Sequence, residues 1–202
     1  MGPVLPTPPT TLIPTRQVRR KDEKPPEDVA AVVAALLVGR LPVGESFVGP
    51  SDDRPGRRKF GYAVNAELPL ADQGDTGLFA RAGWNDGHTE SFAFAEVDRT
   101  LSGGIQLSGA HWGRPTDHLG IAFAINGLSA AHRDYLALGG KGFTLGDGAL
   151  SYGHERIIEA YYSYAVFNHF TLSPDIQLVR HPGYNRDRGP ARFIGLRAHL
   201  EL

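Results

Sequence analysis

Apolar and mostly polar residues alternate along the last twelve residues of the chain, 191–202. The apolar positions of this segment are Ile194, Leu196, Ala198, Leu200 and Leu202. A side-chain period of two over this length predicts a β-strand, because successive side chains of a strand point to opposite faces. We therefore expect the chain to end in a strand with one apolar face.

The same alternation recurs in six upstream segments of about ten residues, with turn residues between them. We predict seven strands, at residues 59–68, 76–86, 99–111, 117–127, 155–166, 169–180 and 191–202. The connections between them are alternately short and long: 69–75, 112–116 and 167–168 are short, whereas 87–98, 128–154 and 181–190 are longer. Short periplasmic turns and long external loops are typical of an antiparallel transmembrane β-barrel.

One face of the predicted strands is apolar and the other carries charged side chains. The charged residues of the second face are Glu67, Arg81, Glu159, Asp175 and Arg197. In a soluble sandwich the apolar face would meet a second apolar sheet, but a water-filled interior accounts better for this charged face. The expected fold class is therefore all-β, with lipid on the apolar side and water on the other.

Aromatic residues are expected where the barrel meets the two membrane interfaces, since their rings suit a boundary between apolar and polar surroundings. The predicted topology places Trp84 at the outer rim, and Tyr164, Phe167 and Phe170 at the periplasmic rim.

The N-terminal part of the chain has a different character. Residues 1–26 combine prolines with a charged run and predict a disordered head. The Ala-rich segment 27–41 begins with acidic residues and ends near a basic one, which favours a short helix, and residues 42–58 resemble a linker. We expect one region at 1–58 and the barrel region at 59–202.

Composition narrows the choice of function. The chain has 25 Gly, 15 Pro and no Cys, and its formal net charge is -1. This charge provides no overall basic field for nucleic acid, and the absence of Cys excludes disulfides and thiolate metal sites. No apolar run reaches about eighteen residues, so the sequence offers no transmembrane helix. The His residues lack ligand spacing, and HERIIE has Ile158 where a zinc protease motif needs its second His, so no metal or cofactor is expected.

Three long segments carry a resemblance to a known family. They are GLFARAGWNDGHTESFAFAEVDR (77–99), SGAHWGRPTDHLGIAFAINGLSAAHRDYL (108–136) and IIEAYYSYAVFNHFTLSPDIQLVRHPGYNRDRGP (157–190). They are similar to the C-terminal part of the carbohydrate-selective porins of the OprB type, over roughly residues 60–202. The resemblance implies a barrel of about sixteen strands in a Gram-negative outer membrane, through which sugars diffuse passively. We expect this chain to be a truncated copy that carries the C-terminal part of such a barrel.

The resemblance also implies partners and a substrate path. The partners are a mono- or oligosaccharide in the pore, outer-membrane lipid and the barrel assembly machinery, with homo-oligomers left open. A sugar that crosses the pore exchanges hydrogen bonds with water for bonds to the wall, and charged groups and amides suit this exchange. The predicted substrate-contacting residues are those of the polar register: Asn65, Glu67, Arg81, Asn85, Gln106, Glu159, Tyr161, Asp175 and Arg197.

Two other classes of function compete with a channel. The first is a soluble β-sheet module that binds sugar. The second is a glycoside hydrolase in which Glu67 and Glu159 act as acid and base, which requires about 5 to 10 Å between their carboxyl groups. A water-filled lumen would not raise a carboxyl pKa by burial, so the enzyme is disfavoured and no catalytic residue is assigned.

Overall fold

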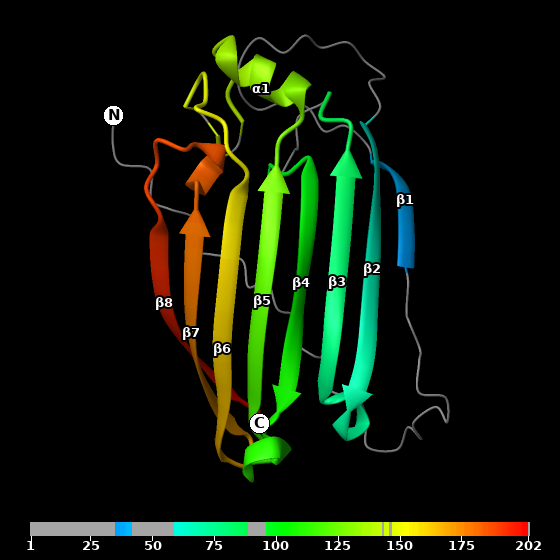
Figure 1. Cartoon of the computed structure of the whole chain (residues 1–202), viewed down its shortest axis with the longest axis vertical. Helices are drawn as coiled ribbons and strands as arrows, with labels where there is room; N and C mark the ends of the chain where they lie inside the picture. Colours follow the sequence, from blue (N-terminus) through cyan, green and yellow to red (C-terminus); the bar gives the residue numbers. More distant parts are fainter. Residues whose placement is uncertain (1–34, 42–58, 89–95, 143, 146, 202) are drawn as a thin grey trace.

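The computed structural model of the protein describes residues 35–41, 59–88, 96–142, 144, 145 and 147–201, with the backbone alone for 35–41 and 59. These residues form one antiparallel sheet of eight strands, in which each strand pairs with the strands next to it in sequence. The sheet is a single curved layer (Figure 1). The strands are β1 (Ala35–Leu41), β2 (Lys59–Ala71), β3 (Thr76–Asn85), β4 (Arg99–Ser108), β5 (His118–Gly127), β6 (Glu155–Phe167), β7 (Phe170–Arg180) and β8 (Ala191–Leu200).

All seven predicted strands are present, as β2 to β8, with their boundaries shifted by a few residues. Strand β2 extends to Ala71 rather than residue 68, whereas β4, which was predicted to reach residue 111, ends at Ser108. Residues Gly109–Trp112 form the 3-10 helix η2 instead. The remaining short helices are η1 (Asp72–Gly74), η3 (Pro182–Tyr184) and the α-helix α1 (Ala130–Ala137).

The predicted helix at 27–41 is wrong for its second half. Residues Ala35–Leu41 are strand β1, which pairs with β2 from Ala35 opposite Asn65 to Leu41 opposite Lys59. Helix propensity is only a weak preference, and a short isolated helix is marginally stable in water. Pairing with the edge of β2 gives the backbone of these residues hydrogen-bond partners instead. Residues 27–34, the predicted head at 1–26 and the predicted linker at 42–58 lie outside the described residues.

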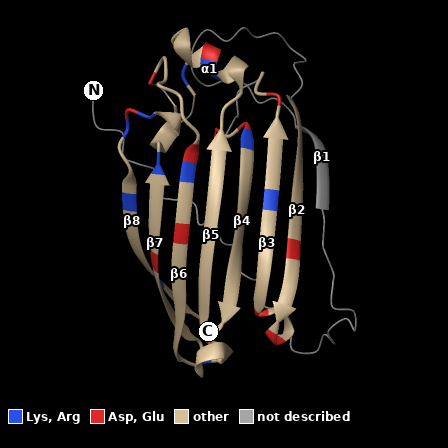
Figure 2. Ribbon diagram, viewed as in Figure 1, with Lys and Arg blue, Asp and Glu red and all other residues tan. Residues whose placement is uncertain are grey.

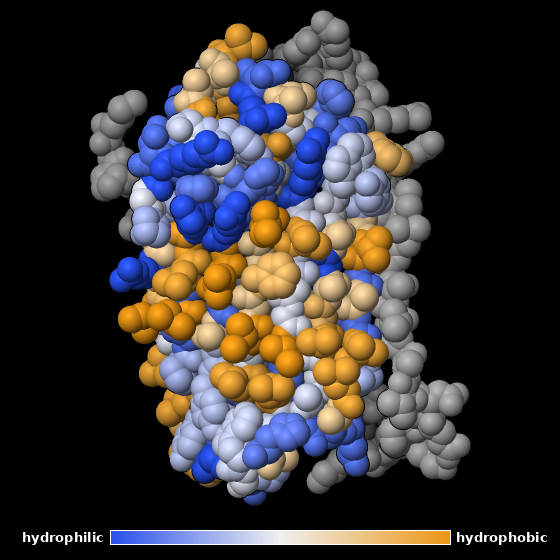
Figure 3. Space-filling model, in the orientation of Figure 1, coloured by the Kyte–Doolittle hydropathy of each residue, from blue (hydrophilic) through white to orange (hydrophobic). Residues whose placement is uncertain are grey.

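The register of the sheet places the apolar residues of β2 to β8 on one face, which we call the apolar face. One row of paired positions crosses seven strands and consists of Leu68, Leu78, Ile105, Ile121, Ala160, Ile176 and Ile194. Large side chains of this face are exposed: Ile121 is 46% exposed and Ile194 is 86% exposed. Figure 3 shows them as a broad hydrophobic band across the strands, with hydrophilic surface beyond it.

Short turns join the strands at one end of the sheet, the short-turn end, where the connection from β4 to β5 holds β6 in place. Its central residue is Asp117, whose side chain is 0% exposed. The carboxylate of Asp117 accepts hydrogen bonds from the guanidinium of Arg114, from the hydroxyl of Tyr162 at 2.7 Å and from the backbone N–H of Ala165 at 3.0 Å. The indole of Trp112 donates to the Tyr162 hydroxyl at 3.0 Å and extends the network to the 3-10 helix η2 (Gly109–Trp112).

Burial of the Asp117 carboxyl disfavours its charged form, but this effect is outweighed by the donors around it. The hydrogen bonds from Arg114, Tyr162 and Ala165 lower the pKa of Asp117 from 3.8 to about 2. The same contact with Asp117 raises the pKa of Arg114. A charged carboxylate therefore joins β5 to β6 at this end of the sheet.

The long connections lie at the opposite end, the long-loop end, and pack against one another there. Leu128, Leu136, Leu145 and Tyr184 form a small buried core, with Leu150 and Tyr152 packed against it. Helix α1 contributes Leu136 and lies over the ends of the strands (Figure 1). We call the described residues of these connections, 86–88, 96–98, 128–154 and 181–190, the loop cap. Among the described residues, no helix is long and apolar enough to cross a membrane.

Candidate functional site on the polar face of the sheet

The face opposite the apolar face, which we call the polar face, collects the predicted substrate-contacting residues. All nine occupy positions that alternate with the exposed apolar residues of their strands. Figure 2 shows that charged residues are sparse along the middle of the strands and gather toward their ends. The polar face is therefore a mixed surface of amides, hydroxyls, aromatic rings and a few charges.

The first group of these residues lies where β2 pairs with β3. The Nε of Arg81 donates to the side-chain oxygen of Asn65 at 3.0 Å, and Arg81 Nη2 lies 3.8 Å from Glu67 Oε1. The guanidinium carbon of Arg81 lies 5.4 Å from the ring centroid of Phe79, whose register partner on β2 is Glu67. Arg81 and Glu67 remain partly exposed, so a planar set of donors and a carboxylate are accessible to solvent.

The second group crosses β4, β5 and β6 in one row. The hydroxyl of Tyr161 donates to Gln106 Oε1 at 2.9 Å, and Gln106 Nε2 donates to the carbonyl of Asp75 at 3.2 Å. Gly120 on β5 lies between Gln106 on β4 and Tyr161 on β6, and a Cβ on Gly120 would overlap the Tyr161 ring. The missing side chain leaves room for the aromatic ring over Gly120 on the polar face.

The row continues to β7 and β8. Asp175 is the register partner of Tyr161 and of Gly195, and its carboxyl covers the position that a Cβ of Gly195 would occupy. Arg197 follows on β8, opposite Ser173. These positions extend the polar face to the last strand of the sheet.

Glu159 has a different environment from the others. Its side chain is fully buried, and its row partners are Ala122 on β5 and Gln177 on β7, both of which are also buried. The sequence pattern correctly assigned Glu159 to the polar face but gave no sign of its burial. Gln177 has the same alternation and was not among the predicted substrate-contacting residues, although its position on β7 is equivalent to that of Glu159 on β6.

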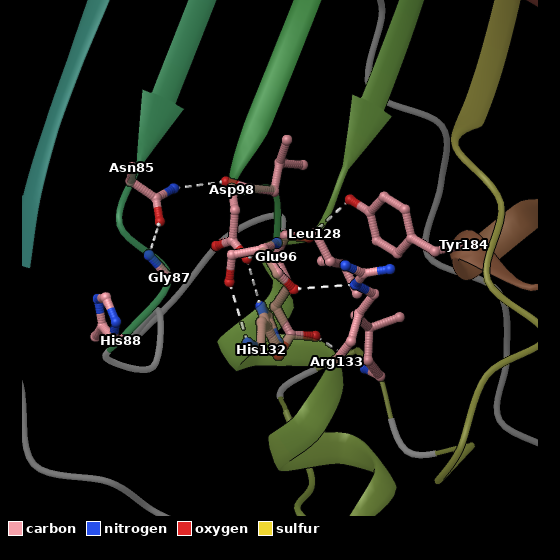
Figure 4. A network of polar contacts seen from close by, with 12 residues as sticks. Asn85, Gly87, His88, Glu96, Asp98, Leu128, His132, Arg133 and Tyr184 are labelled. Atoms are coloured by element: carbon pink, nitrogen blue, oxygen red, sulfur yellow. Dashed lines mark hydrogen bonds and ion pairs between the residues drawn. The ribbon is translucent and has the colours of Figure 1, made fainter.

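Asn85 lies at the long-loop end of the polar face and anchors the loop cap. Its side-chain nitrogen donates to the carbonyl of Val97 at 2.9 Å, and its side-chain oxygen accepts from the backbone N–H of Gly87 at 2.9 Å (Figure 4). The amide thereby fixes both arms of the connection between β3 and β4. The described contacts of Asn85 are those of a loop anchor, which alternation along β3 does not reveal.

The same region contains a buried network that sequence reasoning missed. Glu96 accepts hydrogen bonds from the backbone N–H of Thr144 at 2.8 Å, from its hydroxyl at 2.7 Å and from the N–H of Leu145 at 2.9 Å. The hydroxyl of Tyr184 donates to the carbonyl of Glu96 at 2.7 Å, and burial is the largest cause that raises the pKa of Tyr184. The residue pairs in this network are far apart in sequence, so no local motif marks them.

A second carboxylate ties helix α1 to the sheet. Asp98 Oδ2 accepts from the backbone N–H of Ser129 at 2.8 Å and lies 3.0 Å from His132 Nδ1 (Figure 4). Burial opposes the charge on Asp98, but the hydrogen bonds to His132 and Ser129 prevail and lower its pKa. The long connections are therefore a packed, hydrogen-bonded cap. Within the described residues, no group of three or more His, Asp or Glu side chains is placed to hold a metal ion.

Comparison with known proteins identifies the family. The sequence model described as "Carbohydrate-selective porin, OprB family" matches residues 24–202, which is most of the chain. The chain belongs to the OprB family of carbohydrate-selective porins. The match begins upstream of the segments that carry the sequence resemblance and includes β1. No curated protein matches the chain.

A solved structure of the same type shares the fold. The chain is 23% identical to the protein in the "High pH structure of Pseudomonas putida OprB", with a TM-score of 0.57. The match covers 71% of this chain and 35% of that chain, so this OprB-family chain spans about a third of the length of the solved porin. The expected all-β porin fold is thereby confirmed.

Proposed function

We propose that the chain forms part of the wall of a passive, carbohydrate-selective diffusion channel in a Gram-negative outer membrane. The observation that carries this proposal is the two-sided sheet, with large apolar side chains exposed on one face and hydrogen-bonding groups on the other. Hydrocarbon solvates the first face at no cost, whereas water and sugar solvate the second. Soluble proteins rarely expose an apolar patch of this extent.

In this proposal the nine predicted residues of the polar face, together with Phe79, form the wall along the sugar path. Tyr161 and Phe79 offer aromatic faces, whereas Arg81, Arg197 and Asp175 offer charge-assisted hydrogen bonds to hydroxyl groups. Each contact is partly exposed and therefore weak, which allows the sugar to leave as well as enter. Glu159, which is buried, supports this wall from behind its surface.

The glycosidase alternative is opposed by the spacing of its two carboxylates. Glu67 on β2 and Glu159 on β6 lie in one row of the sheet, four strand spacings apart through Phe79, Gly104 and Ala122. At about 4.8 Å per spacing this is roughly 19 Å along the sheet. Retaining and inverting glycosidases need about 5 to 10 Å, so the two carboxylates are too far apart to act together.

Conductance measurements test the proposal. The purified chain is added to a planar phosphatidylcholine bilayer, and we expect channel currents that a series of neutral mono- and oligosaccharides blocks in a concentration-dependent way. Arg81→Ala and Arg197→Ala should change the concentration of sugar needed for half block while the protein remains folded. Release of reducing sugar without current would instead support the enzyme. Recovery of the chain in buffer rather than in membranes would support the soluble module.

The remaining parts of the proposal concern regions or partners outside the described sheet. We propose that residues 1–58 are largely separate from the barrel wall, apart from the pairing of β1 with β2. We also propose that the barrel assembly machinery and outer-membrane lipid are its partners. Pulldown of the assembly machinery with the chain during expression tests the first of these partners.

A further inference from the structure

Four arginines lie where the apolar face meets the long-loop end of the sheet. They are Arg99 on β4, Arg156 on β6, Arg180 on β7 and Arg192 on β8. Each lies two residues from an exposed apolar residue of its strand, and each is itself exposed. They therefore project from the same side of the sheet as the hydrophobic band, and not toward the polar face. Figure 2 shows basic residues at the long-loop ends of β4, β6 and β7.

Arg156, Arg180 and Arg192 form the dense part of this cluster, which we call the arginine patch. Arg156 and Arg180 are direct register partners, and Arg192 pairs with Leu178, two residues from Arg180 on the same strand. Opposed Cα atoms in an antiparallel pair are about 4.5 to 5.5 Å apart. Like charges directly opposite each other destabilise a strand pair, so an anion bound between these arginines would stabilise the arrangement.

The protein itself does not supply that anion among its described residues. No ion pair joins any residue of the arginine patch to a carboxylate in the part of the chain that the structure describes. The nearest acidic residue in sequence, Glu155, belongs to the opposite face of β6 and accepts a hydrogen bond from the N–H of Gly183 at 2.9 Å. The register places Arg156 and Arg180 two residues from the exposed pair of Ile158 and Leu178. Figure 3 shows that the hydrophobic band gives way to hydrophilic surface toward the long-loop end.

We propose that the arginine patch binds the phosphate groups of a phosphorylated glycolipid in the outer leaflet of the membrane. This inference rests on the proposed membrane location, in which the long loops are external. A lipid whose acyl chains lie on Ile158 and Leu178, in the exposed row below, would bring its headgroup to the level of Arg156 and Arg180. Guanidinium groups bind phosphate with two parallel hydrogen bonds, and basic residues near a surface add to the attraction.

The choice of a lipid rather than free phosphate follows from this position. A free phosphate ion would remain in water, whereas the patch lies at the edge of a surface that hydrocarbon covers. The proposal therefore predicts that binding requires both the phosphate and the acyl chains of the same molecule.

Native mass spectrometry of the full chain in detergent micelles with added lipid A tests the proposal. The variant Arg156→Gln/Arg180→Gln should bind lipid A roughly 10- to 30-fold more weakly than the wild type. The matched control Lys141→Gln/Arg186→Gln removes the same charge from exposed positions of the loop cap and should bind as the wild type does. Arg192→Gln alone should give a smaller loss, and dephosphorylated lipid A should bind weakly to every variant.

Three results would overturn the proposal: equal binding by the patch variant and the wild type, an equal loss in the control, or displacement of lipid A by millimolar inorganic phosphate. Sugar block of conductance in pure phosphatidylcholine bilayers is measured on the same variants and should not change. Arginine-dependent binding of lipid A by a chain that conducts no sugar would leave this inference standing and defeat the proposed channel, so the two failures are distinguishable.

Discussion

Adjacent residues of one strand have opposite surroundings in this protein. Ile194 is 86% exposed on the apolar face, whereas Phe193 belongs to the polar face opposite Gln177. An arginine at the first position would be placed in hydrocarbon, whereas an arginine at the second would be placed in a polar interior. The comparison isolates the face, because depth in the membrane and position along β8 are nearly the same.

Ile194→Arg should destabilise the protein folded in a bilayer by about 2 to 4 kcal/mol, the cost of a basic residue near the membrane midplane. Phe193→Arg should cost clearly less. Urea titration of the chain in phosphatidylcholine vesicles, followed by the shift of folded protein on unheated gels, measures both. Equal tolerance of arginine at the two positions would refute the assignment of the faces.

A single carboxylate at the short-turn end should control the acid stability of the sheet. The pKa of Asp117 is about 2 in the folded protein, compared with 3.8 for an unperturbed aspartate. Its contribution to stability is therefore complete above about pH 4 and is lost as the pH falls from there to about 2. The stability advantage of the wild type over Asp117→Asn should shrink over this range.

Unfolding measured at several pH values between 2 and 6 checks this dependence. Asp187→Asn, at an exposed position of the loop cap, is the control and should show little difference from the wild type at any pH. A constant gap between the wild type and Asp117→Asn down to pH 2 would show that the charge of Asp117 does not hold β5 to β6.

At the scale of elements, the loop cap depends on the carboxylate of Glu96, which accepts hydrogen bonds from two backbone N–H groups and a hydroxyl. Glu96→Ala would leave the N–H groups of Thr144 and Leu145 without their acceptor, at about 1 to 3 kcal/mol for a buried group. Because β4 and β5 keep their own ladder, we expect the cap to loosen while the sheet persists. Trypsin should then cleave after Lys141 at a higher rate than in the wild type.

Asp134→Ala is the matched control for this experiment, since it removes an exposed carboxylate from helix α1. Cleavage after Lys141 should proceed at the wild-type rate in this variant. If Glu96→Ala is cleaved no faster than the control, the contacts of Glu96 do not limit opening of the cap.

The sequence predicted most of the secondary-structure elements, but not all of them. Strands β2 to β8 and their two faces were predictable, because a side-chain period of two marks strands that have one apolar and one polar face. Strand β1 was not, because Ala-rich residues have helix propensity and the β2 edge that they pair with is distant in sequence. Helix η2 was also missed, since Asp117 forms the contacts that curl the chain after β4.

The candidate site was predictable as a face but not in its contacts. The alternation assigned Arg81 and Tyr161 to the polar face, but the hydrogen bonds to Asn65 and Gln106 depend on strand register. The burial of Glu159 and the anchoring role of Asn85 likewise arise from neighbours on other strands and loops. Contacts such as that of Tyr184 with Glu96 connect residues 88 positions apart and leave no local pattern.

At the scale of the whole molecule, the described sheet is open. Strands β1 and β8 each have one strand neighbour among the described residues. The outward side chains of β8 reflect this: Ile194 and Leu196 are 86% and 71% exposed, compared with 46% for Ile121 on β5. An open edge exposes backbone N–H and C=O groups, and in hydrocarbon each unsatisfied group costs several kcal/mol.

The 202-residue chain, reconstituted alone, should therefore insert as an assembly of two or more copies whose edges pair. Native mass spectrometry of protein extracted from phosphatidylcholine vesicles should show multiples of the chain mass, and two differently tagged copies should copurify from the same vesicles. Heating should dissociate these species, because edge pairing and barrel closure are lost together. A stably inserted, protease-resistant monomer would contradict the prediction, since its two edges would then have to be satisfied within one copy.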